Sequence, residues 1–331
     1  MPLRGAGLLL VAAIVGCSAL AQSQALRLEK EIDLPGVEGR IDHLTADPER
    51  QRVYIAAVAN GTVEVVDLRQ GRCVGEIKGL KEPQGLLYVP INNNLYVATG
   101  GDGMVRSYDG TTLAPLHSIS LGDDADNLRW DHQSNSVMVG YGDGAIAFLN
   151  LNLAGKAKVE VRLPAHPESF QIPGNGSGLF VNLPGDQSVA SISLIPLAVS
   201  AKWRHLGALA NFPMAVDQGS DRIFIACRMP ARLLELNTKT GTVVERIETV
   251  GDADDLFFDE SRGRIYVIGG EGFIDVQSFA KNGKLSSIGH IPTAPGARTG
   301  IFVPGWNKVL VAAPHRDRNP ARLLVYDLPE E

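Results

Sequence analysis

The chain has 331 residues, of which 44% are hydrophobic and only 6% aromatic, and it contains 36 glycines and 19 prolines. Its 31 basic and 37 acidic residues give a net charge of −6, which argues against nucleic acid as the main partner. Beyond the N-terminal stretch, no apolar run is long enough to cross a bilayer, and the composition is typical of a turn-rich β protein.

Residues 1–21 predict an export signal, because Arg4 precedes the apolar run LLLVAAIVG and a final ALA supplies the small residues that a signal peptidase accepts. Their removal would leave one domain, residues 22–331, with 30 basic and 37 acidic residues and a net charge of −7. The mature protein would then be periplasmic or secreted. A second interpretation stays open, because the segment IVGC ending at Cys17 resembles a lipobox. Removal of residues 1–16 and lipidation of Cys17 would make the protein a membrane-anchored lipoprotein.

A pattern of about 42 residues repeats seven times along the rest of the chain. Each copy holds a short β-branched and aromatic run, such as VYIAA or LYVAT, bounded by turn residues. Successive runs have their centres 42, 42, 42, 44, 42 and 44 residues apart. The seven centres are Tyr54, Tyr96, Met138, Phe180, Phe224, Tyr266 and Leu310.

The residues around each run predict a unit of four strands. A tight turn, such as the Asn-Gly pair at residues 60–61, leads from the run into a further strand, VEVVDL in the first copy. Another strand follows in most copies, as in CVGEI and KVEVRL. This pattern predicts an all-β, seven-bladed β-propeller with four-stranded antiparallel blades.

The two ends of the chain are expected to close the ring together. The last copy ends at LLVYDLPEE without a fourth strand, while the segment LRLEKEIDLP, residues 26–35, precedes the first copy. We expect this N-terminal strand to complete the last blade and cover its open edge. Cys73 and Cys227 fall in the first and fifth units, too far apart for a disulfide.

The runs LYVAT and IYVIG, with the trailing VVDL and VYDL, resemble those of the YVTN-type seven-bladed β-propellers of bacteria over essentially the whole mature chain. The resemblance implies an exported propeller and supplies no catalytic motif. The sequence has no GxSxG, CxxC, P-loop or paired metal-binding histidines, which weighs against common hydrolases, haem attachment and nucleotide enzymes.

Polar residues recur where the first strand of each unit should enter the central channel. Because these strands line the channel, one fixed offset from the strand centres should give a ring of neighbours. Twelve residues before the centres stand Asp42, Gln84, Asp126, Glu168, Phe212, Asp254 and Arg298. Eleven residues before them stand His43, Gly85, Asn127, Ser169, Pro213, Asp255 and Thr299. Side chains alternate along a strand, so only one set should point fully inward.

Carboxylates outnumber basic groups at these positions, so we expect an electronegative channel mouth. Converging carboxylate and amide oxygens are ligands for a divalent cation such as calcium, with Asp126, Glu168 and Asp254 as candidates. His43 and His166 are the histidines nearest to the mouth, where a neighbouring carboxylate would suit a general base. The structural alternative is that these side chains cap backbone N–H groups and pair with arginines.

The loop at residues 314–321, PHRDRNPA, is about four residues longer than its equivalents and should open on the same face. It would bring His315 and Arg316 to the mouth, and the fifth unit adds Arg228. A basic loop over an acidic axis would suit a zwitterionic or anionic ligand.

These features favour a non-catalytic binding scaffold with its ligand at the channel mouth. The expected ligand-binding residues are Asp42, His43, Gln84, Asp126, Asn127, Glu168, Asp254, Asp255, Arg298, His315 and Arg316. Two alternatives stay open. One is a metal-dependent hydrolase or lactonase with an axial cation, by analogy with six-bladed propeller lactonases. The other is a platform for protein–protein interaction.

Overall fold

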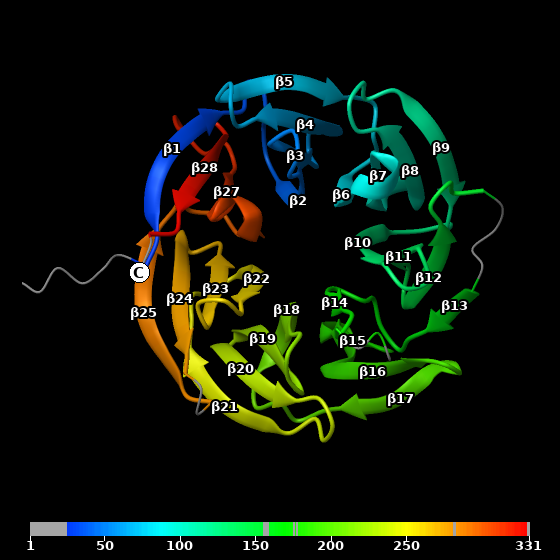
Figure 1. Cartoon of the computed structure of the whole chain (residues 1–331), viewed down its shortest axis with the longest axis vertical. Coiled ribbons are helices and arrows are strands. Elements are labelled where there is room, and N and C mark those ends of the chain that lie inside the picture. The colour runs from blue at the N-terminus through cyan, green and yellow to red at the C-terminus, as the bar shows by residue number, and fades with distance from the viewer. Residues whose placement is uncertain (1–24, 155–158, 175, 177, 281–282, 330–331) are drawn as a thin grey trace, which may run out of the picture.

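The computed structural model describes residues 25–154, 159–174, 176, 178–280 and 283–329. Its strands form a ring of seven four-stranded antiparallel sheets around a central axis (Figure 1). The predicted seven-bladed propeller is therefore confirmed. The predicted export signal and Cys17 lie outside the described residues.

Each blade runs from an inner strand at the axis to an outer strand at the rim. Blade 1 consists of β2 (Ile41–Asp47), β3 (Arg52–Ala57), β4 (Thr62–Asp67) and β5 (Arg72–Ile77). Blade 2 consists of β6 (Pro83–Val89), β7 (Asn94–Thr99), β8 (Met104–Asp109) and β9 (Pro115–Ser120). Blade 3 consists of β10 (Ala125–Asp131), β11 (Ser136–Tyr141), β12 (Ala145–Asn150) and β13 (Val159–Arg162). Blade 4 consists of β14 (Phe170–Gln171), β15 (Gly178–Leu183), β16 (Ser188–Leu194) and β17 (Leu197–Trp203).

The remaining three blades follow the same order. Blade 5 consists of β18 (Leu209–Asp217), β19 (Arg222–Met229), β20 (Ala231–Asn237) and β21 (Val243–Glu248). Blade 6 consists of β22 (Ala253–Asp259), β23 (Arg264–Gly269), β24 (Phe273–Phe279) and β25 (Leu285–Pro292). Blade 7 consists of β26 (Thr299–Val303), β27 (Lys308–Ala313), β28 (Arg322–Asp327) and β1 (Arg27–Asp33).

Short 3-10 turns connect some of the strands. They are η1 (Pro90–Asn92), η2 (Gly100–Asp102), η3 (Pro184–Asp186) and η4 (Pro304–Trp306). Within the described residues, no helix has the length and apolar character needed to span a bilayer.

The closing strand β1 pairs antiparallel with β28 at the rim of blade 7 (Figure 1), as the sequence predicted. Ile32 on β1 and Leu34 just after it are 2% and 1% exposed and pack in the core between blades 7 and 1. Burial of an aliphatic side chain contributes about 1.5–3 kcal/mol. The two ends of the chain are thus joined in one blade, which leaves β28 without a free edge.

The hydrophobic core lies between adjacent blades. The seven strand centres found in the repeat all lie on the second strand of a blade, and all are buried. Tyr54 of blade 1, for example, packs against Leu86 and Tyr88 of blade 2. Its hydroxyl donates a hydrogen bond of 2.8 Å to the backbone oxygen of Gly110. The aromatic centres therefore hold neighbouring sheets together, and the inner strands remain free to present polar side chains.

Candidate functional site

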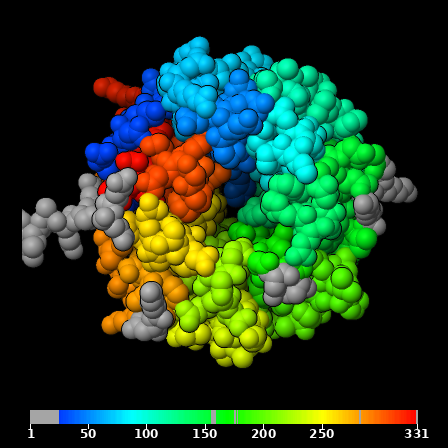
Figure 2. Space-filling view, viewed as in Figure 1, coloured from blue at the N-terminus to red at the C-terminus, as the bar shows by residue number. Residues whose placement is uncertain are grey.

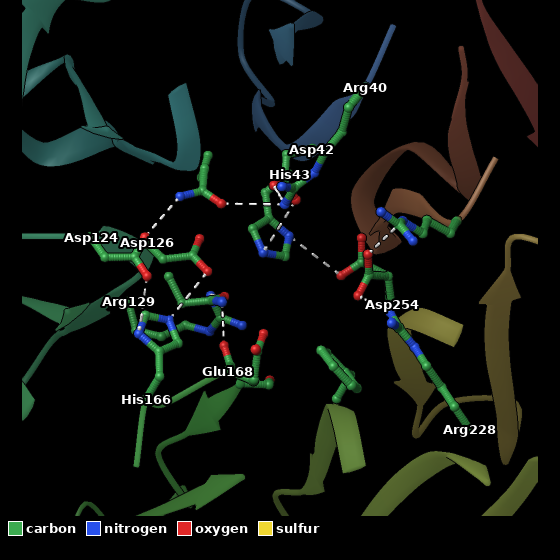
Figure 3. Close-up of a pocket in the computed structure, with 16 residues that line it drawn as sticks. Arg40, Asp42, His43, Asp124, Asp126, Arg129, His166, Glu168, Arg228 and Asp254 are labelled. Carbon is green, nitrogen blue, oxygen red and sulfur yellow. Dashed lines mark hydrogen bonds and ion pairs between the residues drawn. The ribbon is translucent and has the colours of Figure 1, made fainter. Parts of the chain in front are cut away.

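The mouth of the central channel holds a polar cavity of about 440 Å³, at the hollow seen in the centre of Figure 2. Its side chains come from all seven blades and are drawn in Figure 3. The cavity is lined by Arg40, Asp42, His43, Gln84, Asp124, Asp126, Asn127, Arg129, His166, Glu168, Ser169, Phe212, Arg228, Asp254, Asp255 and Arg298.

The cavity gathers most of the positions that the repeat singled out. All seven residues twelve positions before the strand centres line it. From the second set, the lining includes His43, Asn127, Ser169 and Asp255. Gly85 of that set lies where two blades approach closely, since a Cβ atom there would be 2.1 Å from the backbone oxygen of Asp126. The repeat offset therefore locates the channel mouth.

β-Bulges allow two neighbouring residues of one strand to face the cavity. In blade 1, the pairing of β2 with β3 shifts register between Ile41 and Leu44, so Asp42 and His43 lie in the bulge. The inner strands β10 and β22 have equivalent shifts near their starts. An extra residue on the bulged strand redirects the side chains around it. The strict alternation expected from the sequence is thus broken in these three blades.

The long loop of blade 7 lies outside the lining of the cavity. His315 Nδ1 is 2.7 Å from Glu38 Oε2, and the backbone of Arg316 exchanges hydrogen bonds with that of Asn319. His315 and Arg316, which were expected at the mouth, therefore lie outside the cavity lining. The loop packs on itself and on the segment that leads into blade 1, instead of covering the axis.

Two arginines hold a carboxylate between blades 5, 6 and 7. Arg228 Nη2 donates to Asp254 Oδ1 at 2.5 Å, and Arg298 Nε lies 3.0 Å from Asp254 Oδ2. Burial raises the pKa of Asp254 to about 6, although both arginines counteract this rise. The Arg228 guanidinium also lies 3.7 Å from the ring centroid of Phe212. Both oxygens of Asp254 are thus occupied by the protein itself.

His43 lies between a carboxylate of its own strand, β2, and a carboxylate of β22. Its Nε2 is 3.9 Å from Asp42 Oδ1 and its Nδ1 is 3.8 Å from Asp255 Oδ1. Burial alone would lower the pKa of His43, but the surrounding carboxylates, chiefly Asp42 and Asp255, raise it to about 9. Burial raises the pKa of Asp255 to about 7, despite the imidazole and a 2.8 Å hydrogen bond from the Gly300 N–H. Arg40 also donates to Asp42, so this carboxylate has two cationic neighbours.

His166 makes a second imidazole–carboxylate contact, between blades 3 and 4. Its Nδ1 is 2.7 Å from the backbone oxygen of Gly142, which can only accept, so Nδ1 carries a proton. Asp124 Oδ2 is 3.5 Å from Nδ1 and Asp126 Oδ2 is 3.8 Å from Nε2. Burial alone would lower the pKa of His166. Its hydrogen bonds to Asp126 and Gly142 and the negative charges of Asp126 and Asp124 outweigh burial and raise the pKa to about 9.

Two carboxylates next to His166 keep unused acceptor positions. Asp126 is 8% exposed, and its Oδ1 is buried without a hydrogen-bond partner. Among the described residues, none donates a hydrogen bond or forms an ion pair to the carboxylate of Glu168, while its backbone oxygen accepts a bond from Asn127. Burial and the neighbouring Asp126 raise the pKa of Glu168 to about 7.

Asp124 and Arg129 also line the cavity, although neither was predicted from the sequence. Asp124 occupies, two residues before Asp126, the position that Arg40 and His166 occupy in their own units. Arg129 lies two residues after Asn127 on β10, so strand alternation places both on the same face. A search of the repeat that also included the positions two residues before Asp126 and two residues after Asn127 would have found both side chains.

The lining holds acidic and basic side chains in equal number. Six carboxyl side chains face four arginines and two histidines whose pKa values are near 9. The expectation of an electronegative mouth came from two offsets of the repeat, and Arg129, Arg228 and His166 line the cavity from outside both. The cavity is therefore a dense mixture of both signs of charge, and it suits a ligand that carries both.

The three candidate metal ligands are not gathered around one point. Across the described ranges, no three histidine, cysteine, aspartate or glutamate side chains come together as they would around one ion. Asp126 faces His166, and Asp254 is held by Arg228 and Arg298. A hard cation needs several converging oxygens, and two of these three carboxylates face cationic side chains instead.

Comparison with known proteins shows the fold. No protein-family model and no curated protein matches the chain. The structure is similar to a chain of the hydrazine synthase of Kuenenia stuttgartiensis, with 15% identity, a TM-score of 0.72, and coverage of 84% of this chain and 95% of the other. It is also similar to a chain in the crystal structure of a mitotic checkpoint complex, with 14% identity, a TM-score of 0.79, and complete coverage of both chains. At such identities, the similarity is one of β-propeller architecture alone.

Proposed function

We propose that the protein is a binding protein that holds a small polar ligand in the cavity at the channel mouth. The observation that carries this proposal is Asp126 Oδ1, a carboxylate oxygen buried in the cavity wall without a partner. Buried polar atoms are nearly always hydrogen-bonded, and an unsatisfied one costs about 1–3 kcal/mol. A donor group of a ligand would offset this cost once the carboxylate, whose side chain is 11% exposed, turns this oxygen toward the cavity.

The scaffold supports binding because most of the site residues lie on the inner strands of a closed ring or in the segments that lead directly into them. Their backbones are fixed by the ladders of the blades, so little conformational entropy is lost when a ligand enters. A cavity of about 440 Å³ is in the range of small-molecule sites.

The ionisation states of the two histidines disfavour their use as general bases. With pKa values of about 9, His43 and His166 are protonated near neutral pH, and His166 donates a hydrogen bond to Gly142. We further propose, from the N-terminal sequence, that the protein acts outside the cytoplasm. The intact mass of the mature protein would distinguish cleavage after Ala21 from lipidation at Cys17.

The test is thermal unfolding of the wild type with amino acids, sugars, dicarboxylates and polyamines, repeated with Asp126→Asn. A ligand at about 100 times its Kd stabilises the native state by about 2.7 kcal/mol, which raises the Tm. The matched control is Asp221→Asn, since Asp221 is half-exposed in the turn between β18 and β19 and lies outside the cavity lining. The proposal fails if no compound raises the Tm, or if Asp126→Asn responds as the wild type does.

A further inference from the structure

The cavity has one side on which the central carboxylate uses both of its oxygens and one side on which several hydrogen-bonding positions stay unused. Toward blades 5 to 7, Asp254 is held by Arg228 and Arg298. Toward blades 3 and 4, Asp126, Arg129 and Glu168 retain unused hydrogen-bonding capacity (Figure 3). A ligand gains most where it supplies missing partners, so the second side is where it should make its polar contacts.

Arg129 is the unpaired cation on this side. Its Nη1 donates to the backbone oxygen of Leu128 at 2.7 Å and lies 3.5 Å from Asn127 Oδ1, and its guanidinium is 5.6 Å from the ring centroid of Phe170. Within the described part of the chain, no carboxylate lies within 4.0 Å of it. Burial lowers the pKa of Arg129, but a guanidinium remains charged in proteins. It presents further N–H donors in a planar fork that matches a carboxylate.

The unused acceptors are Asp126 Oδ1 and the carboxylate of Glu168, while Asp126 Oδ2 faces His166. Asp126 Oδ1 lacks a donor although the residue is more than nine-tenths buried. The pKa of Glu168 is raised by burial and by the nearby charge of Asp126, so a cation placed between them would favour the ionised form of both. A primary ammonium group carries three donors on one positive charge, which fits two adjacent carboxylates.

We infer that the ligand is a small zwitterion with its carboxylate at Arg129 and its primary ammonium group at Asp126 and Glu168. This inference rests on the proposed binding function and names the ligand class. A purely anionic ligand would face both carboxylates, and a simple amine would leave Arg129 unpaired. Asp126 and Arg129 are three residues apart on β10, so their Cα atoms are about 10 Å apart. Side chains that reach into one cavity from these points can be bridged by a molecule of amino-acid size.

The test is isothermal titration of the full chain with a series in which the separation of the two charges varies. The probes are glycine, β-alanine, 4-aminobutyrate and 6-aminohexanoate, with butylamine and butyrate as matched single-charge compounds. At least one zwitterion should bind at least tenfold more tightly than both single-charge compounds. Arg129→Gln should reduce its affinity to that of butylamine, and Asp126→Asn should reduce it to that of butyrate.

Two further variants separate recognition from folding. Arg27→Gln is the control, because Arg27 lies on the outer strand β1 with 67% of its side chain exposed, and it should leave affinity unchanged. If Arg129→Gln does not fold, as judged by circular dichroism, Arg129→Lys keeps the charge and removes the planar fork. It should still weaken zwitterion binding at least tenfold.

The inference is overturned if no zwitterion binds, if butylamine or butyrate binds as tightly, or if the Arg129 variants keep full affinity. Binding of another class of compound that depends on Asp126 would overturn the zwitterion inference but leave the proposed function standing. Absence of binding by any compound in the wider screen would overturn both.

Discussion

The charge on His43 should make the protein less stable as the pH rises above neutrality. Carboxylates act on this imidazole from its own strand, through Asp42, from β22, through Asp255 and Asp254, and from β10, through Asp126. They raise the pKa of His43 from 6.5 to about 9. Below pH 6.5 both the folded and unfolded states bind the proton, and the stabilisation is fully present. It is lost as the pH rises to about 9, because the unfolded state releases the proton first.

The size of the effect follows from the difference of about 2.5 between the two pKa values. At 1.36 kcal/mol for each pH unit, the upper limit is about 3 kcal/mol. The side chain is 21% exposed, so solvent screens the interaction only in part. Removal of the imidazolium also raises the pKa of Asp255, because His43 lowers it in the wild type. The titration of Asp255 then adds some pH dependence to the stability of the variant. We therefore expect His43→Gln to reduce the pH dependence by about 1–3 kcal/mol.

The assay is urea unfolding at about pH 6 and about pH 9.5. Wild type, His43→Gln and the control His117→Gln are compared, since His117 is exposed on the outer strand β9. The free energy of unfolding should fall between the two pH values in wild type and control, and fall less in His43→Gln. His166 contributes to the remaining fall with the same sign, because its pKa is also about 9. An identical fall in all three proteins, or an imidazole pKa near 6.5 in an NMR titration, would refute this reasoning.

Two other outcomes follow from the fold and the site. Ile32→Ala should lower the free energy of unfolding by about 2–5 kcal/mol, because Ile32 is 2% exposed and anchors the closing strand. Leu28→Ala on the same strand should change it by less than about 0.5 kcal/mol, since Leu28 is 44% exposed, and equal effects in urea unfolding would contradict the closing role of Ile32. Calcium or EDTA should leave the Tm unchanged, because no three potential metal ligands come together in the described chain. A shift of more than about 2 °C with either one would speak for a metal site.

The sequence by itself was sufficient to determine the architecture. Seven copies of a period of about 42 residues, with four short runs in most copies, predict seven equivalent sheets, and residues 26–35 could supply the strand that the last copy lacks. The same register located the channel mouth, because every copy enters the axis at the same offset from its strand centre. These features depend on backbone periodicity, which local sequence encodes.

Only the tertiary structure decided how the charged groups are partnered. The bulges that turn both Asp42 and His43 toward the cavity arise from the pairing of β2 with β3, and no residue pattern in the repeat marks them. Arg298 reaches Asp254 from another blade, whereas Arg129 meets no carboxylate, although both are arginines near the axis. The packing of neighbouring blades decides which arginine meets a carboxylate. The repeat in the sequence carries no information about the distances between residues of different copies. The sequence therefore locates the site, and the packing of seven blades decides which of its groups remain free for a ligand.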